Sequence, residues 1–376
     1  MNIIQKAKIT KGTAVLLRAD FNVPIKNNKI VDSFRIDTTI KTINHIIKKG
    51  GVLTIVSHLG DDGTQSLLPV YLYLKKKYNL DISFFQGPLN KTTVNIIKRE
   101  RTTQVVLVEN IRMNTGEKKN TPAFGALLAS LGEIYINDAF SVSHRPHASI
   151  VGVPKYISGF AGFQLQSEVE KLSKVFNPKH PFLFILGGNK FSTKIDLLKK
   201  FEKKADAFFL GGALLNDMLL AVGFPVGVSL VEGNKKNTEM LQKLYANKKC
   251  ITPQDVVVAR GKETVTVDIN DVLAKDAIYD VGKETTKELL DMVKTAKTVL
   301  WNGPLGKYDI GYDKASKTLL KALSASKKQV IIGGGDTVAL VHKMKLENAF
   351  THVSTGGGAT LDFLSQGTLP GILALK

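Results

Sequence analysis

The stretch PFLFILGGNKFSTKIDLL, residues 181–198, decides the fold expected for this chain. Its unbroken apolar run, Phe182–Leu186, predicts a strand buried on both faces, as in a parallel sheet. Two glycines then allow a sharp turn at the carboxyl end of that strand, where α/β sheets bind their ligands. We expect Lys190 and Lys194 to lie on one face of the helix that follows. Such a place suits a phosphate, although two lysines on a solvated helix are also common.

The composition fits a protein of two domains. With 376 residues, 43% of them hydrophobic, the chain can bury a full core and has the length for two domains. Its single cysteine, Cys250, excludes an internal disulfide framework and is typical of a reducing cytosol. The sequence has no N-terminal apolar leader and no apolar run of the roughly 18–20 residues that a membrane span needs. We therefore expect a soluble, cytoplasmic protein without membrane contact.

The formal charge of +19 raises the alternative of a nucleic-acid-binding protein. The basic residues are mostly lysines in pairs that are spread along the whole chain, which is typical of solvated helix faces. No aromatic-rich basic cluster and no nucleic-acid-binding signature accompany them. A lysine-biased proteome explains the charge more simply, so no specific nucleic acid is expected, and a basic RNA-binding protein stays an alternative.

In the first 150 residues, strands and helices alternate, a pattern that predicts a doubly wound parallel sheet. The apolar runs predict strands over residues 14–19, 52–56, 105–108 and 133–136. An amphipathic helix is expected over residues 36–48. The helix after the second strand is expected to turn one hydrophobic side to the core, formed by Leu67, Leu68, Leu72 and Leu74.

Polar side chains follow each of these four strands. Because the carboxyl ends of parallel strands meet at one edge of a sheet, they should gather there. They are Arg18, Asp20, Asn22, His58, Arg112 and Arg145. The chain has only seven arginines, and Arg35 is a further one in this region. Arginine supplies a planar, bidentate donor where lysine is the common cation. The pattern favours a small anion held by side chains, with ordinary ion pairs as the alternative.

The second half ends its strands in glycines. The segments are FILGGNK, FFLGGAL (208–214), VIIGGGDT (330–337) and HVSTGGGAT (352–360), with VLWNGPLG (299–306) between them. Glycines at strand ends let a ligand approach backbone N–H groups, so four clusters predict a larger anion such as a nucleotide polyphosphate. The sequence contains neither GxxxxGK[ST] nor GxGxxG, which argues against a P-loop enzyme and weakens a dinucleotide interpretation. Asp336, before an expected helix, is a candidate ligand of Mg²⁺, and the sequence fits equally well with Asp336 as the N-cap of that helix.

Together the two halves predict phosphoryl transfer across an interdomain cleft that closes to exclude water. A polar helix over residues 163–176, followed by three residues that break the chain, marks the boundary between the domains. These residues are Asn177, Pro178 and Pro181.

Eight motifs resemble those of the phosphoglycerate kinase family, and they occur in the family's order over nearly the whole chain. They are RADFNVP (18–24), SHLG (57–60), ENIR (109–112), NDAFSVSHRPHAS (137–149), GGNKFSTK (187–194), WNGPLG (301–306), GGGDT (333–337) and STGGGA (354–359). The resemblance implies reversible, direct in-line phosphoryl transfer between 1,3-bisphosphoglycerate and Mg-ADP, which gives 3-phosphoglycerate and Mg-ATP in glycolysis. A monomer with these small-molecule substrates is expected.

The resemblance also implies the domain organisation. Two Rossmann-like doubly wound parallel-sheet domains are joined by a helix. The N-terminal domain, residues 1–160, would bind phosphoglycerate, and the C-terminal domain, residues 178–358, would bind the nucleotide. Residues 161–177 would form the interdomain helix, and the tail, residues 359–376, would pack back on the first domain.

Residue roles follow by position from the same resemblance. The residues implied to bind phosphoglycerate are Asp20, Phe21, Asn22, Arg35, His58, Leu59, Gly60, Asp61, Arg112 and Arg145. Those implied to bind ATP or ADP are Gly187, Gly188, Lys190, Lys194, Gly211, Gly212, Asn302, Pro304, Gly306, Asp309, Gly333, Gly334, Gly335, Asp336 and Thr337. Asp336 would also meet Mg²⁺. The implied catalytic residues are Arg35, Lys194, Gly334 and Gly357.

Four positions depart from the family pattern. Asp61 replaces an arginine, and it must either point away from the phosphate or weaken substrate affinity. Thr193 replaces an aspartate, Ala213 a glycine, and Asp309 a glutamate. These changes keep open the alternative of a catalytically impaired, nucleotide-binding pseudoenzyme.

Overall fold

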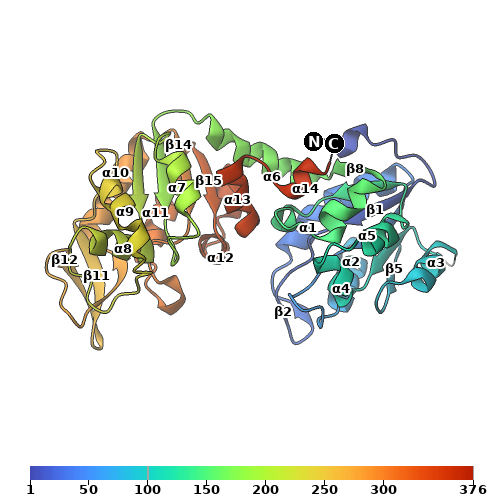
Figure 1. Cartoon of the computed structure of the whole chain (residues 1–376), viewed down its shortest axis with the longest axis horizontal. Coiled ribbons are helices and arrows are strands. Elements are labelled where there is room, and N and C mark those ends of the chain that lie inside the picture. The colour runs from blue at the N-terminus through green and yellow to red at the C-terminus, as the bar shows by residue number, and fades with distance from the viewer. Residues whose placement is uncertain (100, 376) are drawn as a thin grey trace. The chain divides into compact units, whose positions relative to one another are not determined.

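The structure, a computed structural model, describes residues 1–99 and 101–375 (Figure 1). The chain divides into two compact units, one formed by Met1–Glu170 with Gln366–Lys376 and the other by Lys171–Ser365. A parallel sheet forms the centre of each unit, which confirms the predicted α/β class with two doubly wound sheets. The division falls within α6 (Phe163–Ser173). Lys376, the last residue of the predicted tail, lies outside the described residues.

Six parallel strands form the sheet of the first unit, in the order β5-β6-β4-β1-β7-β8. Four of them are the predicted strands. The two edge strands, β5 and β8, were not predicted, because neither is buried along its whole length. The bounds are β1 (Ala14–Arg18), β4 (Val52–Val56), β5 (Ile82–Phe85), β6 (Val105–Val108), β7 (Ile134–Asn137) and β8 (Ser158–Ala161), with a hairpin of β2 (Ile25–Lys26) and β3 (Lys29–Ile30).

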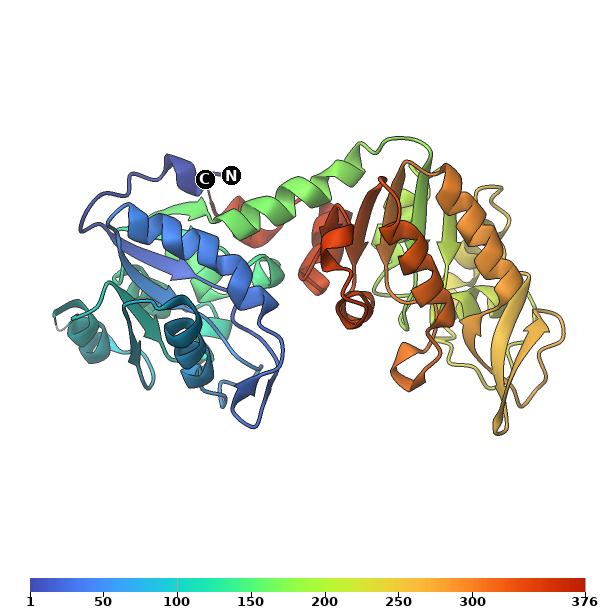
Figure 2. The same cartoon turned by 180° about the vertical axis from the view of Figure 1, so that it is seen from behind.

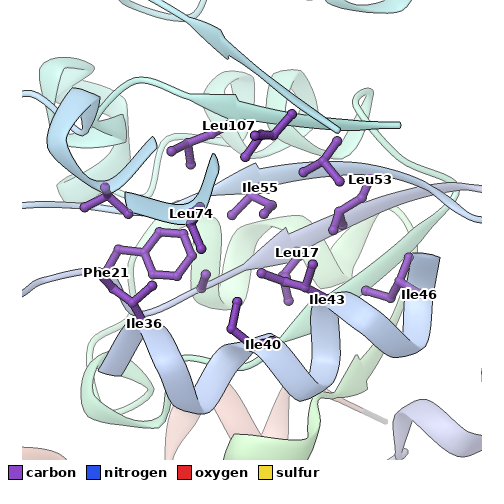
Figure 3. Close-up of a cluster of buried hydrophobic side chains, with 14 of the residues drawn as sticks. Leu17, Phe21, Ile36, Ile40, Ile43, Ile46, Leu53, Ile55, Leu74 and Leu107 are labelled. Atoms are coloured by element: carbon purple, nitrogen blue, oxygen red, sulfur yellow. The ribbon is translucent and has the colours of Figure 1, made fainter. Parts of the chain in front are cut away.

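Alternate residues of the central strands build one side of the core. Leu17 of β1 lies in register with Ile55 of β4, and both side chains point to α1 (Phe34–Lys48) (Figure 3). That helix packs against them with isoleucines that are three or four residues apart and therefore lie on one face. They are Ile36, Ile40, Ile43 and Ile46. Each fully buried isoleucine contributes about 1.5–3 kcal/mol relative to an exposed one. Figure 2 shows α1 and α2 (Leu68–Tyr78) on this face of the sheet.

One predicted helix face is wrong. In α2 (Leu68–Tyr78) the buried residues are Val70 and Leu74, whereas Leu68 is 42% exposed and Leu72 is 53% exposed. Leu67 precedes the helix and is buried. The buried stripe therefore follows positions 67, 70 and 74, and the two exposed leucines lie four residues apart on another face. The other helices of this unit are α1 (Phe34–Lys48), α3 (Lys91–Arg99), α4 (Thr115–Lys118), α5 (Pro122–Ala129) and α14 (Pro370–Leu373).

The second unit has a five-stranded parallel sheet in the order β10-β9-β14-β15-β16. Four of the five strands were predicted, the fifth, β14, lies in the segment VLWNGPLG, and β9 is buried at every residue. The bounds are β9 (Phe182–Leu186), β10 (Ala207–Leu210), β14 (Thr298–Asn302), β15 (Gln329–Gly333) and β16 (His352–Val353). Helices surround the sheet: α7 (Ile195–Phe201), α8 (Ala213–Ala221), α9 (Thr238–Tyr245), α10 (Lys283–Thr295), α11 (Lys314–Ser324), α12 (Gly335–Lys343) and α13 (Gly358–Gln366).

A second, antiparallel sheet in this unit was not predicted. Its strand order is β12-β11-β13, with β11 (Asp255–Arg260), β12 (Glu263–Asp268) and β13 (Ala277–Val281). The strand β12 carries no buried residue, so its sequence ETVTVD has no apolar run. This sheet contributes to the ligand pocket described below.

The two ends of the first unit meet. The N–H of Asn2 donates to the carbonyl of Leu375 at 2.9 Å, and the N–H of Gly371 donates to the carbonyl of Ser143 at 2.8 Å. Residues 366–375 therefore belong to the first unit, whereas residues 359–365 belong to the second (Figure 1). None of the helices in the described part of the chain combines the length and the apolarity that a membrane span requires.

Candidate functional site

Four arginines surround His58 at the carboxyl edge of the first sheet. His58 follows β4, and its Nδ1 lies 3.0 Å from Nη2 of Arg18. A guanidinium only donates, so Nδ1 accepts and the neutral ring carries its proton on Nε2. Burial, and then the positive charge of the arginines, keeps the pKa of the His58 imidazole well below its usual range. The arginines are Arg18, Arg112, Arg145 and Arg35. The predicted convergence is therefore present in the structure.

Arg18 has a different place from the one predicted for it. Its side chain is buried, and its Nε donates to Oγ of Ser149 at 2.9 Å. Ser149 Oγ in turn donates to the buried carboxylate of Glu117 at 2.6 Å. Arg18 is thus held from behind and orients His58, instead of lying on the rim as an anion ligand. The serine and glutamate were missed because nothing in the sequence distinguishes them from ordinary polar residues.

Arg35 lies at the start of α1, beside the loop that follows β1. Its Nη1 is 3.4 Å from Oδ2 of Asp20 and donates to the carbonyl of Asn22 at 3.2 Å. The side-chain oxygen of Asn22 accepts from the N–H of Gly60 at 3.0 Å. The structure therefore brings together residues from two strand ends and one helix, as predicted. Arg35 keeps a partly exposed guanidinium that an anion can reach.

Asp61 points to the basic cluster. Its Oδ1 accepts from Nη1 of Arg112 at 2.7 Å and lies 3.9 Å from Nη1 of Arg145. The Arg112 side chain is only 1% exposed, whereas that of Asp61 is 85% exposed. Nη2 of Arg112 is buried and has no hydrogen-bond partner among the described residues. Of the two alternatives for Asp61, the one in which it points away is wrong.

Phe21 and Leu59 contribute differently from the polar residues. Both side chains are buried in the hydrophobic core of the first unit. The N–H of Phe21 donates to Oγ of Ser57 at 2.9 Å, and the carbonyl of Leu59 accepts from Nδ2 of Asn110 at 2.6 Å. Their roles are therefore to fix the backbone of the two loops that carry the polar groups.

A pocket of about 340 Å³ lies at the carboxyl ends of the second sheet. It lies where the strand order reverses, because β9 is followed by β10 on one side and by β14 on the other. Ligands of doubly wound sheets bind at this place. The predicted residues that line it are Gly188, Gly212, Pro304, Gly306, Asp309 and Asp336.

Several lining residues were not predicted. They are Asn189, Ala213, Leu215, Asn216, Leu230, Ile278, Tyr279, Asp280, Leu305, Lys307 and Tyr308. The apolar members come from α8, from β13 and from an irregular segment, so only the three-dimensional fold unites them. The other predicted nucleotide residues do not line this pocket: Gly187, Lys190, Lys194, Gly211, Asn302, Gly333, Gly334, Gly335 and Thr337.

Lys194 lies below the glycine turns at the ends of β9 and β14. Its side chain is 9% exposed, and its Nζ donates to the carbonyl of Gly187. A Cβ at Gly188 would lie 2.5 Å from this Nζ, and one at Gly303 would lie 2.7 Å away. Both positions must be glycine for the ammonium group to reach the turn. Burial lowers the pKa of Lys194 to about 8, and the nearby carboxylate of Asp336 opposes the shift.

The expected placement of the two lysines on one helix is wrong. The helix α7 begins at Ile195, so Lys194 is its N-cap and Lys190 is an exposed loop residue. The loop is fixed in place by Glu232, whose carboxylate accepts from the N–H of Ser192 at 2.8 Å and from its Oγ at 2.5 Å. A carboxylate therefore binds Ser192, the residue before Thr193, although it comes from a distant segment of the chain.

Asn302 has a buried amide below the third glycine turn. Its Oδ1 and Nδ2 have no hydrogen-bond partner among the described residues. A Cβ at Gly333 would lie 2.8 Å from Nδ2, so the amide is directly beneath the turn that leads into α12. Buried polar groups without partners call for a ligand or an ordered water. This amide supports a polar ligand at the turn.

Asp336 lies in the first turn of α12, whose N-cap is Gly334. The alternative of an N-cap aspartate is therefore wrong. Its exposed carboxylate accepts from the hydroxyl of Tyr308 at 3.1 Å. The first N–H groups of this helix have no carbonyl partner within the helix, so they favour an anion in front of them. Gly357, with φ +52°, precedes α13 and does not line the pocket.

Comparisons with known proteins identify the family. The family model for phosphoglycerate kinase matches residues 4–367. A protein named phosphoglycerate kinase from Orientia tsutsugamushi (strain Ikeda) is 38% identical over 386 residues, which cover 98% of this chain and 95% of the relative. One of the same name from Pseudothermotoga lettingae is 37% identical over 378 residues, which cover 96% and 95%.

Solved structures of phosphoglycerate kinases are also similar. The structure from Coxiella burnetii has a TM-score of 0.85 and 33% identity, and the match covers 99% of this chain and 98% of that one. The structure from Pyrococcus horikoshii OT3 has a TM-score of 0.87 and 25% identity, with 100% and 98% covered. The chain therefore belongs to the phosphoglycerate kinase family.

Proposed function

We propose that this phosphotransferase moves a phosphoryl group reversibly between 1,3-bisphosphoglycerate and ADP, giving 3-phosphoglycerate and ATP. The observation that carries the proposal is the pairing of two sites in one chain of this family. One unit gathers four arginines around a neutral His58, and the other has a pocket of about 340 Å³ beside a buried Lys194. The first suits a small phosphorylated acid, and the second suits a nucleotide.

Phosphoglycerate would bind in the first unit. Arg35, Arg112 and Arg145 would meet its anionic groups, and their charge-assisted hydrogen bonds to phosphate are the strong kind. His58 would donate from Nε2, because Arg18 holds its other nitrogen as an acceptor. Asp20 and Asn22 would orient Arg35 and the Gly60 loop, as they do in the structure, by the contacts described above.

The nucleotide would bind in the second unit. Leu215, Leu230 and Ile278 form an apolar part of the pocket that suits a base. Asp309, which also lines the pocket, would meet the ribose. The phosphates would then lie toward the glycine turns and the first N–H groups of α12. Lys194 would meet the phosphoryl group that moves, and Lys190, which is exposed, would come to the nucleotide only by a movement of its loop.

The residues present fit Mg²⁺ bound together with the nucleotide. The described residues contain no group of three or more His, Cys, Asp or Glu that could hold a metal alone. Mg²⁺ bound to a nucleotide needs only one or two carboxylates, since phosphates and water supply the other ligands. Asp336 would be that carboxylate. When bound, the ion neutralises charge on the phosphates.

The chemistry needs no general base. In the ATP-consuming direction, a carboxylate oxygen of 3-phosphoglycerate attacks the γ-phosphorus, and the bond to the β–γ bridging oxygen breaks with its electron pair leaving on ADP. The carboxylate is already ionised at pH 7, so no proton moves. Catalysis then consists of alignment and charge neutralisation. Arg35 and Lys194 would be the clamps on the moving group, and N–H groups of Gly334 and Gly357 would assist them.

This mechanism requires both units, because neither contains both sites. We propose that they close around the substrates, exclude water and align the reacting groups. We also propose that the protein acts as a cytoplasmic monomer without a nucleic-acid partner. The retained arginines and Lys194 favour an active enzyme over a pseudoenzyme.

A coupled assay of the purified chain tests the function. We expect oxidation of NADH, through a coupling dehydrogenase, that requires 3-phosphoglycerate, ATP and Mg²⁺ together. Binding of ATP without such turnover would instead identify a pseudoenzyme. RNA binding that falls steeply with salt and does not change when phosphoglycerate is added would instead support a basic RNA-binding protein.

A further inference from the structure

A second pocket lies at the amino-terminal edge of the five-stranded sheet, opposite the nucleotide pocket. Its volume is about 490 Å³. Lys179 precedes β9, Lys297 precedes β14 and Lys328 precedes β15, so the starts of three adjacent parallel strands supply lysines to it. The full lining is Lys174, Lys179, Thr295, Ala296, Lys297, Lys327, Lys328, Gln329 and Thr351. Five of these nine residues are lysines and none is acidic.

No ion pair among the described residues neutralises the five ammonium groups. None of them lies within 4.0 Å of a carboxylate in the described part of the chain. The nearby Lys294 by contrast pairs with Asp291 at 2.7 Å. Like charges gathered in one pocket repel each other, so an anion that binds them all relieves the repulsion.

The backbone around the pocket is held in place. The N–H of Lys297 donates to the carbonyl of Pro181 at 2.8 Å, and the N–H of Gln329 donates to the carbonyl of Lys297 at 3.0 Å. Lys328 is also fixed, because its Nζ donates to the carbonyls of Lys294 and Ala296 at the end of α10, at 2.8 and 2.6 Å. The pocket is therefore lined by the hydrogen-bonded backbone at the edge of the sheet as well as by lysine side chains.

One further group in the lining favours a polar ligand. Nε2 of Gln329 is buried and has no hydrogen-bond acceptor among the described residues. Buried donors of this kind call for a ligand or a water. The lining holds no aromatic side chain on which a nucleic-acid base could stack. Lysines act on phosphate as point charges, without the planar geometry that arginine imposes.

From these observations we propose that this pocket binds a linear oligophosphate of three or more phosphates. The ligand is held by the charges of the five lysines, and the pocket is separate from the nucleotide pocket. A single phosphate meets fewer of the lysines and binds more weakly. RNA, which needs stacking as well as charge, is the less favoured ligand.

Isothermal titration of the full chain with sodium tripolyphosphate tests the proposal. The titration is done with saturating ADP and 3-phosphoglycerate and without Mg²⁺, so that the substrate sites are filled. The test variant is K174Q/K179Q/K327Q, which removes three exposed lysines of the lining. The matched control is K235Q/K236Q/K248Q, which removes three exposed lysines of the same unit outside the lining. Both variants change the net charge equally, and circular dichroism establishes that both are folded.

We expect one tripolyphosphate to bind the original chain and the control with affinities within about twofold. The affinity of the test variant should be at least about tenfold lower, and orthophosphate should bind the original chain more weakly than tripolyphosphate. Binding to the original chain should weaken with added salt. Equal affinities for the two triple variants, or no binding with the substrate sites filled, would overturn the proposal. So would RNA that binds the pocket more tightly than tripolyphosphate.

Discussion

Asp61 places a carboxylate where the proposed mechanism needs positive charge. Its carboxylate accepts a hydrogen bond from Arg112 at 2.7 Å and lies 3.9 Å from Arg145. It therefore forms ion pairs with two of the three arginines assigned to the substrate. We predict that Asp61→Asn lowers KM for 3-phosphoglycerate and leaves KM for ATP unchanged. The asparagine keeps the size of the side chain and removes its charge.

The size of the effect follows from the exposure of Asp61, which is 85%. A carboxylate about 7 Å from a phosphate opposes it by about 0.6 kcal/mol per charge at the dielectric constant of water, and by about 2 kcal/mol at a dielectric constant of 20. The exposed position favours the lower value, and salt screens it further. For a phosphate of nearly two charges we expect about 1 kcal/mol, which is about fivefold in KM.

Asp62 provides a matched control for this experiment. It is the next residue, it carries the same charge, and its carboxylate accepts from Thr64 instead of from an arginine. Initial rates with varied 3-phosphoglycerate should therefore show the lower KM in Asp61→Asn and not in Asp62→Asn. A higher KM in Asp61→Asn would mean that the carboxylate holds Arg112 in its binding orientation, and equal effects of the two changes would mean a general charge effect. Either result refutes the reasoning.

Three further predictions concern the second unit. Lys194→Ala should lower kcat by about 10²-fold, as loss of other electrostatic stabilisers does, whereas Lys199→Ala, an exposed change on α7, should have little effect in the same assay. Because burial lowers the pKa of Lys194 to about 8, kcat/KM for ATP should fall above that pH, to about a tenth by pH 9, and Lys194→Arg should remove this fall. A flat profile for the original chain would exclude the assignment. Burial raises the pKa of Asp280 to about 7, so the folded state holds a proton that the unfolded state releases, and stability declines as the pH rises through 7. Urea unfolding followed by Trp301, the single tryptophan, should show about 1 kcal/mol less stability at pH 8 than at pH 6, and Asp280→Asn should abolish this difference.

Most strands of the two parallel sheets were predictable because burial on both faces requires an unbroken apolar run. Leu186 and its four predecessors show this most clearly, since all five residues of β9 are buried. The edge strand β5 and the antiparallel strand β12 could not be predicted, because partly exposed strands need no such run. The buried face of α2 could not be predicted from the sequence either, because leucines occur on more than one of its sides.

The site was predictable in its chemistry and less so in its contacts. Strand ends in a parallel sheet share one edge, so the convergence of arginines on His58 followed from topology alone. The support of Arg18 by Ser149, from 131 residues away, depends on the folded chain. The same is true of Glu232, whose carboxylate binds the loop of Thr193 from 40 residues beyond Ser192. Such contacts join polar residues that no local sequence pattern links.

The most direct test of the central claim follows the phosphoryl group itself. The purified chain is mixed with ADP, Mg²⁺ and 1,3-bisphosphoglycerate that carries ³²P in its carboxyl phosphate. We predict that the label appears in ATP, and that it does so far more slowly with Arg35→Ala or Lys194→Ala. Label that appears only in inorganic phosphate, or that stays in 1,3-bisphosphoglycerate while ADP is bound, would contradict the proposed transfer.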